Sequence, residues 1–191
     1  MDIQHDRAGY YMCWGCMVWV PSVYTMHTLF LVDNPQELSD NPQELSFEIT
    51  VLYILGGIFS VWCNYDCDRQ RQEFRRTSGK AKIWGSAPEY IEAKFVTEDG
   101  NNHSSLLLAS GWWKIARHFH YVPEITASIF WCAPSAQTAW YAYLPYFYPL
   151  YLTLLLLDRS FRDDQRCSDK YKGYWVEYCD KVPYKILPGI I

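Results

Sequence analysis

Residues that can stack on a ligand, donate hydrogen bonds and carry positive charge are concentrated between Ser110 and Glu124. The stretch contains two tryptophans, an arginine, two histidines and a tyrosine: Trp112, Trp113, Arg117, His118, His120 and Tyr121. It precedes residues 125–157, which include no Asp, Glu, Lys or Arg. This position suits an aromatic belt at a bilayer surface or the mouth of a cofactor site, since polar clusters beside membrane segments are often functional. Position alone favours the belt.

Positive charge gathers in two other segments that could hold phosphate groups. One set follows the second apolar segment and the other follows the last: Arg71, Arg75 and Arg76, then Arg162, Arg166 and Lys170. Guanidinium groups bind phosphate through paired hydrogen bonds, and nearby aromatic residues offer flat faces or hydroxyls to a nucleotide: Trp113, Tyr121, Tyr171 and Tyr178. The sequence has neither a Gly-x-Gly-x-x-Gly nor a Walker motif. For any one arginine, contact with lipid headgroups is the simpler interpretation.

The pair His118 and His120 raises the question of a metal site. Two histidines separated by one residue suit a strand better than a helix, and no third ligand stands at a typical spacing. The sequence therefore predicts no metal. The two acids Asp163 and Asp164, which lie among arginines, are most simply surface ion pairs.

Tyr24 ends an otherwise apolar segment, after Pro21, Ser22 and Val23. A phenol in a dry cavity could act as a general acid. A tyrosine at the membrane interface is the alternative, and position alone favours it.

Apolar and charged segments alternate along the chain, which predicts an all-α polytopic membrane protein. Four segments are apolar enough to span a bilayer, at about 10–32, 47–65, 109–133 and 138–157. Pro21 should break the first. The positive-inside rule assigns segments 66–82 and 158–191 to the cytosolic side, where we expect nucleotide binding. We also expect a short cytosolic β-hairpin near 91–108 and a charged, helical C-terminal tail.

The composition narrows the class of protein. The chain has 191 residues, of which 50% are hydrophobic and 18% aromatic. That length has room for one domain or for a piece of a larger one. The net charge of −4 argues against a nucleic-acid binder, which would normally be basic. The first residues lack the pattern of a signal peptide and resemble the interior of a longer protein.

Seven cysteines are scattered over apolar and charged segments, so the sequence does not predict a disulfide framework. Cys13 and Cys16 have the spacing of a redox motif but no surrounding strand and helix pattern. Burial as small hydrophobic side chains is the favoured interpretation. A perfect heptapeptide duplication, 33–39 and 40–46, is best explained as a lengthened luminal loop.

Longer motifs indicate a family. They lie at 2–10, 13–16, 18–25, 65–77, 111–124, 158–167 and 181–190, and include Gly111-Trp-Trp113 and Lys181-Val-Pro-Tyr-Lys-Ile-Leu-Pro-Gly-Ile190. In these motifs and in their order, the chain resembles the sterol reductases of the C14/C7 reductase family. The likeness covers essentially the whole chain, 1–191, as a single domain. Among family members, those of plants that act on the C7–C8 double bond are the most similar.

The resemblance implies a multi-pass oxidoreductase of the endoplasmic reticulum that reduces a sterol double bond with NADPH. By position, the NADPH contacts fall on ten residues: Arg71, Arg75, Leu108, Trp113, His120, Tyr121, Asp163, Cys167, Tyr171 and Tyr178. The proton donor falls on Tyr24. The implied partners are a sterol substrate, the lipid bilayer and membrane enzymes of sterol biosynthesis, without nucleic acid. The resemblance also turns the interpretation of 110–124 towards a site, with Arg117 and His118 as braces.

Three departures from the family pattern qualify this expectation. Family members have further transmembrane helices before Asp2, so we expect a truncated product whose activity is in question. Lys114 replaces a glycine beside Trp113 and is expected to obstruct the indole or change its direction. Lys172-Gly173 inverts the usual Gly-Lys order. A non-catalytic truncated paralogue that binds sterol, NADPH or a partner reductase is the alternative. A methyltransferase of the isoprenylcysteine type is disfavoured by the length of the matched motifs.

Overall fold

The computed structural model describes residues 13–33, 46–97, 100–137 and 143–190. The motif expected at 2–10 and most of the duplicated heptapeptide lie outside these residues. The chain divides into two compact units, one of Met1–Gly57 with Ala127–Thr153, the other of Ile58–Thr126 with Leu154–Ile191. Three helices contribute residues to both units: α4 (Phe47–Arg76), α6 (Tyr121–Cys132) and α7 (Phe147–Tyr171).

In the described part of the first unit, the helical segment predicted to break at Pro21 is interrupted four residues later, at Thr25. The helix η1 (Gly15–Tyr24) is a π-helix that contains Pro21, and α2 (Met26–Asp33) follows after a turn at Thr25. Proline has no backbone N–H and its ring crowds the preceding turn, so the wider π-helical turn accommodates it. The short 3₁₀ helices η2 (Ala133–Gln137) and η3 (Leu144–Tyr146) complete this unit.

One expectation for the first unit is wrong. Cys13 and Cys16 are exposed free thiols, so burial does not account for them. The reason is that η1 packs few of its side chains, and none of its residues is buried.

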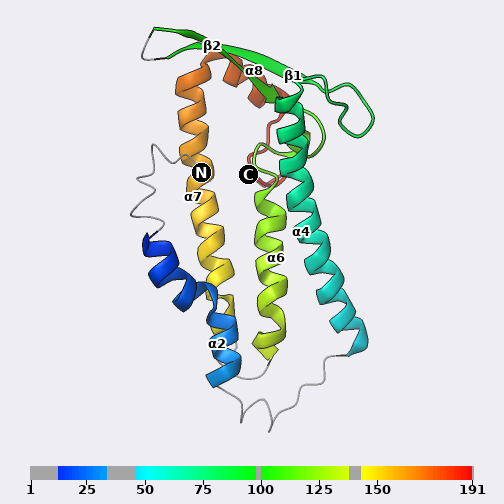
Figure 1. Ribbon diagram of the computed structural model, residues 1–191, viewed down its shortest axis with the longest axis vertical. Coiled ribbons are helices and arrows are strands. Elements are labelled where there is room, and N and C mark those ends of the chain that lie inside the picture. Colours follow the sequence, from blue (N-terminus) through cyan, green and yellow to red (C-terminus); the bar gives the residue numbers. More distant parts are fainter. Residues whose placement is uncertain (1–12, 34–45, 98–99, 138–142, 191) are drawn as a thin grey trace. The chain divides into compact units, whose positions relative to one another are not determined.

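The second unit contains the predicted hairpin and the predicted helical tail. Strands β1 (Tyr90–Val96) and β2 (Asn102–Leu108) pair antiparallel, from Tyr90 opposite Leu108 to Val96 opposite Asn102. The charged part of α7 continues its apolar part without interruption, and α8 (Gly173–Lys181) follows. The hairpin lies across the C-terminal ends of α4 and α7, against α8 (Figure 1).

Within the described residues, α4 is the one helix long and apolar enough to cross a membrane. Its first half exposes large apolar side chains, among them Leu52, Leu55, Ile58 and Phe59, and a large exposed apolar surface is typical of lipid or partner contact. The chain is thus mostly helical, with a small hairpin, as expected. The remaining predicted spans stay predictions.

The predicted span at 109–133 is divided in the structure. A four-residue helix, α5 (Trp112–Ile115), ends at Ala116, whose backbone is extended with φ −158° and ψ 154°. Helix α6 begins at Tyr121. The intervening turn holds Arg117, His118 and His120, so these side chains are set by a turn between two helices.

Two apolar clusters stabilise the second unit. One joins β1 to α8 through Ile91, Trp175, Tyr178 and Val182 with Ala109, and the other joins α4 to β2 and α5 through Phe74, Leu108 and Trp113 with Ile83. Phe74 is completely buried, and complete burial of such a side chain contributes about 1.5–3 kcal/mol. The clusters hold these elements around the functional residues.

Candidate functional site

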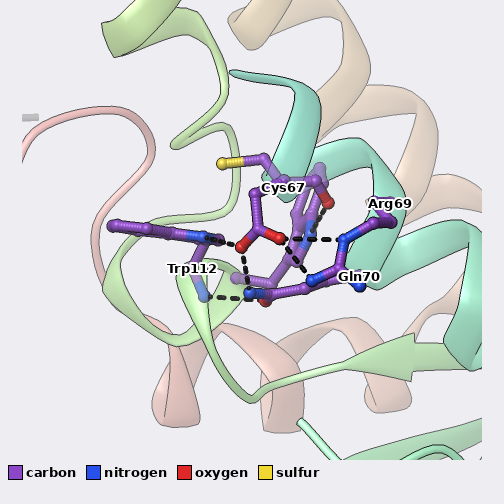
Figure 2. A network of polar contacts seen from close by, with 6 residues as sticks. Cys67, Arg69, Gln70 and Trp112 are labelled. Atoms are coloured by element: carbon purple, nitrogen blue, oxygen red, sulfur yellow. Dashed lines mark hydrogen bonds and ion pairs between the residues drawn. The ribbon is translucent and has the colours of Figure 1, made fainter. Parts of the chain in front are cut away.

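A buried carboxylate on α4 organises the polar side of the second unit. Asp66 is 8% exposed at its side chain and accepts hydrogen bonds from Arg69 Nη2 at 2.6 Å, Gln70 Nε2 at 2.8 Å and Trp112 Nε1 at 2.8 Å (Figure 2). Arg69 and Gln70 lie three and four residues further along the helix, on the same face. Buried charges are stable in proteins when they are paired and hydrogen-bonded in this way. The network fixes Trp112 to α4.

Further hydrogen bonds dock α5 on α4 and fix the neighbouring indole. The backbone N–H of Trp112 donates to Gln70 Oε1 at 3.3 Å, and Trp113 Nε1 donates to the carbonyl oxygen of Cys67 at 2.9 Å. Gly111 permits the close approach because its φ is +63° and any Cβ there would overlap Gln70 and Ile83. Trp113 is therefore buried in a defined orientation.

Beside Trp113 lies a cavity of about 100 Å³. Its walls come from α4, β2, α5, the turn after α5, α7 and α8. The lining residues are Arg71, Phe74, Arg75, Leu106, Leu107, Leu108, Trp113, Arg117, His118, Asp163, Cys167, Trp175 and Tyr178. All belong to the second unit.

Seven of the ten predicted cofactor residues line this cavity: Arg71, Arg75, Leu108, Trp113, Asp163, Cys167 and Tyr178. The other three contact lining residues through their rings. His120 packs against Trp113 with ring centroids 5.0 Å apart, Tyr121 stacks on His118 at 5.1 Å, and Tyr171 stacks on Trp175 at 6.4 Å. These three are placed to support the lining residues.

Three guanidinium groups face the cavity. The Arg71 group lies 4.5 Å from the centre of the Trp113 ring and 3.3 Å from Asp68 Oδ1. Arg75 is exposed. Arg117 is buried, and its Nη1 donates to the carbonyl oxygens of Val182 at 2.8 Å and Pro183 at 3.2 Å. Asp163 is the one acid in the lining, so the cavity has an excess of positive charge.

Arg117 and His118 brace the structure, as expected, and also contribute to the lining. Their backbone N–H groups donate to the carbonyl oxygens of Tyr184 at 3.0 Å and Lys185 at 2.7 Å. Arg117 Nη2 is 3.5 Å from Asp164, and His118 Nε2 is 3.7 Å from Asp163. The C-terminal segment is thereby fixed to the turn that precedes α6.

Other members of the predicted phosphate-binding set lie away from the cavity. Arg76 and Arg162 are exposed and form ion pairs with Glu73 at 2.6 Å and Asp158 at 2.8 Å. Lys170 Nζ lies 4.3 Å from the centre of the Phe95 ring. Exposed ion pairs such as those of Arg76 and Arg162 contribute ~0–1 kcal/mol.

The structure resolves two of the departures from the family pattern. Lys114 does not obstruct Trp113, because its exposed side chain extends to within 3.8 Å of Glu89. That expectation is wrong, since side chains of adjacent residues on a helix point in different directions. Lys172, by contrast, has an unusual backbone conformation. Its φ of +51° and ψ of −120° lie where glycine is favoured.

Burial keeps two lining residues on α7 and α8 protonated. It raises the pKa of the Cys167 thiol to about 12, with a further contribution from the negative charge of Asp163. It also raises the pKa of the Tyr178 phenol, whose hydroxyl donates to the carbonyl oxygen of Leu108 at 3.0 Å. Cys167 is therefore a neutral thiol at physiological pH, and Tyr178 connects α8 to β2.

Tyr24 belongs to the first unit. Its ring makes edge contacts with Trp131 at 5.7 Å and Tyr148 at 5.0 Å between centroids, and the side chain is half-buried. Among the described residues, no hydrogen-bond partner is found for its hydroxyl. The phenol is held by ring packing alone within that part of the chain.

Several lining residues were not predicted as ligands. Trp175 is four residues after Tyr171 and three before Tyr178, so helical spacing could have identified it. Phe74, Leu106 and Leu107 carry no chemical signal in the sequence. No group of three or more His, Cys, Asp or Glu that could hold a metal occurs in the part of the chain that the structure describes.

The donor set fits part of a phosphate-bearing nucleotide. Guanidinium groups match phosphate oxygens, and Arg117 Nε is a buried donor without a hydrogen-bond partner among the described residues. An unmade buried hydrogen bond costs about 1–3 kcal/mol, which an acceptor on a ligand would offset. A volume of about 100 Å³ admits one moiety of a dinucleotide, while the rest must lie outside.

Comparison with known proteins gives a consistent result. The model of the ergosterol biosynthesis ERG4/ERG24 family matches residues 1–191. The chain is 54% identical over 190 residues to 7-dehydrocholesterol reductase of Arabidopsis thaliana, covering all of this chain and 42% of that protein. It is 40% identical over 190 residues to 7-dehydrocholesterol reductase of Xenopus laevis, covering all of this chain and 38% of the relative.

A third relative has another substrate preference in its name. Over 189 residues the chain is 36% identical to a Delta(14)-sterol reductase of Methylotuvimicrobium alcaliphilum, covering 99% of this chain and 40% of that protein. The chain thus spans about two fifths of the length of the curated relatives it matches.

Proposed function

Because this chain belongs to the ergosterol biosynthesis ERG4/ERG24 family, we propose that it provides the NADPH-binding part of a sterol reductase. The reaction is reduction of the C7–C8 double bond of a sterol. Identity of 54% to a 7-dehydrocholesterol reductase against 36% to a Delta(14)-sterol reductase supports the C7 assignment. The protein is then an oxidoreductase of sterol biosynthesis in a membrane.

The observation that carries the proposal is the cavity beside Trp113. It combines positive charge from Arg71 and Arg75 with an aromatic face and with neutral groups on α7 and α8. Seven residues predicted from the family pattern meet there, although they come from five separate elements. Convergence of distant residues on one cavity is typical of a ligand site.

In this proposal NADPH, when bound, supplies a hydride to the sterol. Arg71 and Arg75 neutralise phosphate charge by bidentate contact, and Trp113 supports a planar ring by stacking. Arg117 Nε donates to a phosphate oxygen. Asp163 lies within 3.7 Å of His118 and orients that imidazole. His120, Tyr121 and Tyr171 hold lining residues in place through their ring contacts.

Tyr24 is the proposed proton donor. An isolated double bond accepts hydride poorly, so one carbon must receive a proton while the other receives the hydride. The half-buried phenol packs against Trp131 and Tyr148, and aromatic faces stabilise developing positive charge. Exclusion of water also protects the cationic carbon from side reaction.

The membrane setting belongs to the same proposal. The apolar half of α4 exposes its large side chains, as expected of a helix in contact with lipid. We propose a multi-pass protein of the endoplasmic reticulum with spans at about 10–32, 47–65, 109–133 and 138–157. Segments 66–82 and 158–191 then bind the nucleotide on the cytosolic side. A sterol is the substrate, and membrane enzymes of sterol biosynthesis are the proposed partners.

The test uses the full chain in lipid nanodiscs with two measurements. Calorimetry measures NADPH binding, and mass spectrometry measures loss of the double bond from 7-dehydrocholesterol and, separately, from a sterol with a C14–C15 double bond. Binding with turnover of the first sterol supports the proposal. Binding without turnover of either favours the non-catalytic paralogue. Absence of binding rules out the cavity as a cofactor site, and preference for the second sterol rules out the C7 assignment.

A further inference from the structure

A second, larger hollow lies on the same elements as the cavity. This groove has a volume of about 630 Å³, which is within the ~300–1,000 Å³ typical of small-molecule sites. It is formed by β1, the end of α7 and the start of α8, and its lining includes three lysines and three aromatic rings: Lys94, Lys170, Lys172, Phe95, Tyr171 and Tyr174. The family pattern assigns a role to Tyr171 but none to the lysines.

The three lysines differ in whether their ammonium groups contact other groups of the protein. Lys170 Nζ is 4.3 Å from the centre of the Phe95 ring and 5.2 Å from that of Tyr171. Lys94 and Lys172 are exposed and form no ion pair with another described residue. Asp169 and Glu177 also line the groove, so three ammonium groups face two carboxylates. The lining therefore favours an anion, with Lys94 and Lys172 as its available donors.

The groove and the cavity are lined by neighbouring residues of α7 and α8. Cys167 lines the cavity and Tyr171 lines the groove. They are four residues apart on one face of α7, which is about 6 Å along the helix axis. On α8, Trp175 lines the cavity and packs against Tyr171, while Tyr174 lines the groove. A dinucleotide with one moiety in the cavity is long enough to reach the groove.

We propose that the groove binds the adenosine end of the dinucleotide and that Lys94 and Lys172 hold its 2′-phosphate. This inference rests on the proposed function of the cavity. A phosphomonoester carries about −1.5 to −2 charge at pH 7, and the ring of Tyr171 or Phe95 offers the adenine a stacking surface. The two lysines are then specificity-determining residues, because the 2′-phosphate is what distinguishes NADPH from NADH.

A phosphate could also come from an anionic lipid headgroup, because basic clusters beside a membrane attract such lipids. The aromatic rings in the lining favour the nucleotide, since a headgroup has no planar base to place on them. The experiment separates the two sources by using nanodiscs of neutral lipid for nucleotide binding and vesicles containing phosphatidylserine for lipid binding.

The test measures dissociation constants for NADPH and for NADH with the full chain and a double variant, Lys94→Gln with Lys172→Gly. The glycine suits the backbone at residue 172, where φ is positive, so the variant is not expected to unfold. We expect NADPH to bind about tenfold more weakly, as for loss of a charge-assisted contact, with NADH unchanged. The control Lys114→Ala, whose side chain pairs with Glu89, leaves both constants unchanged.

Four results overturn the inference. An equal loss for both nucleotides means that the variant disturbs the shared part of the site. Unchanged NADPH binding means that the lysines do not touch the 2′-phosphate, and if phosphatidylserine binding alone weakens, the ligand is a headgroup. A native chain that binds both nucleotides equally leaves the cavity as a cofactor site but removes the groove from it. A native chain that binds neither ends the proposed function as well.

Discussion

The two units of the chain hold their functional side chains by different means. Around Tyr24 in the first unit, hydroxyls bond back to the preceding helical turn, as Thr25 Oγ1 does to the carbonyl oxygen of Pro21 at 3.0 Å. In the second unit, hydrogen bonds join residues far apart in the sequence. Trp113 reaches Cys67 across 46 residues, and Tyr178 reaches Leu108 across 70.

This difference corresponds to the two chemical tasks that we propose for the units. A general acid must release its proton, so its hydroxyl should not be consumed by a fixed partner. A cofactor site must instead hold cations and rings in place before the ligand arrives, because preorganisation lowers the cost of binding. The first unit leaves the phenol of Tyr24 to ring contacts, while the second fixes walls of the cavity by hydrogen bonds from Trp113 and Tyr178.

The change Tyr24→Phe should have the largest effect and separates the two tasks most sharply. It removes the proposed proton and retains the ring contacts with Trp131 and Tyr148. We expect sterol turnover to fall by about 10²–10⁴-fold and NADPH affinity to stay constant, as measured by mass spectrometry and calorimetry. Tyr143→Phe, at an exposed tyrosine of the same unit, is the matched control. An equal fall in NADPH affinity would contradict the role of Tyr24 as a donor.

Removal of the carboxylate in Asp66→Ala should have the next largest effect, this time on stability. The change leaves Trp112 Nε1, Gln70 Nε2 and the Arg69 guanidinium without their shared acceptor. Breaking a buried ion pair costs about 3–5 kcal/mol. We expect about 3 kcal/mol here because Arg69 is largely exposed. Denaturant unfolding followed by tryptophan fluorescence measures the loss.

The control for Asp66 is Asp158→Ala, which removes an exposed carboxylate paired with an exposed arginine. That change should cost less than about 1 kcal/mol. Equal losses for the two variants would show that the network around Asp66 does not organise the second unit.

The network around Asp66 also marks the limit of prediction from sequence. The hairpin and the helical tail follow from local patterns of turn residues and charge, and the structure confirms them. The break predicted at Pro21 lies instead at Thr25, four residues later. The partnership of Asp66 with Trp112 does not follow from local patterns, because it depends on how α5 docks on α4 across 46 residues. Arg117 is similar, since its partners at Val182 and Pro183 are backbone carbonyls, which have no signature in a sequence.

The resemblance to the family predicted which residues, far apart in the sequence, belong to one site, and local sequence patterns could not. It brought together Arg71, Leu108 and Tyr178, which the structure places on one cavity. It did not predict the direction of the Lys114 side chain, because an aligned position fixes a Cα and leaves the rotamer open. It also could not separate lining residues from those that contact them, such as His120.

Arg71→Ala tests whether the guanidinium group beside Trp113 contributes to NADPH binding. The arginine is 4.5 Å from that ring centre and lines the cavity. Loss of a hydrogen bond between charged groups costs about 1.5–3 kcal/mol, so NADPH affinity should fall by about 10–100-fold. Calorimetry measures the change. Arg162→Ala, at an exposed arginine paired with Asp158, should leave the NADPH affinity unaltered. A similar loss of affinity there would show that the overall positive charge of the protein attracts NADPH, without a defined contact at Arg71.

The smallest effect we predict is a gain in stability. One residue near the groove, Lys172, has a backbone conformation that destabilises the second unit. Lys172 has φ +51° and ψ −120° at the start of α8, and strained backbone of this kind costs about 1–3 kcal/mol. Glycine tolerates the conformation but loses more entropy on folding. Lys172→Gly should therefore stabilise the chain by about 1 kcal/mol, seen as a rise of a few degrees in Tm.

The matched control for Lys172 is Gln165→Gly, an exposed position within α7. Glycine inside a helix is about 1 kcal/mol worse than other residues, so Tm should fall there. If both changes lower Tm, the positive φ at Lys172 is not a source of strain. If Lys172→Gly raises Tm and weakens NADPH binding together, this chain has retained a strained lysine whose charge contributes to the ligand site. The strained backbone at Lys172 would then lower the stability of the second unit while its side chain contributes to NADPH binding. Strained residues occur at functional sites in other proteins as well.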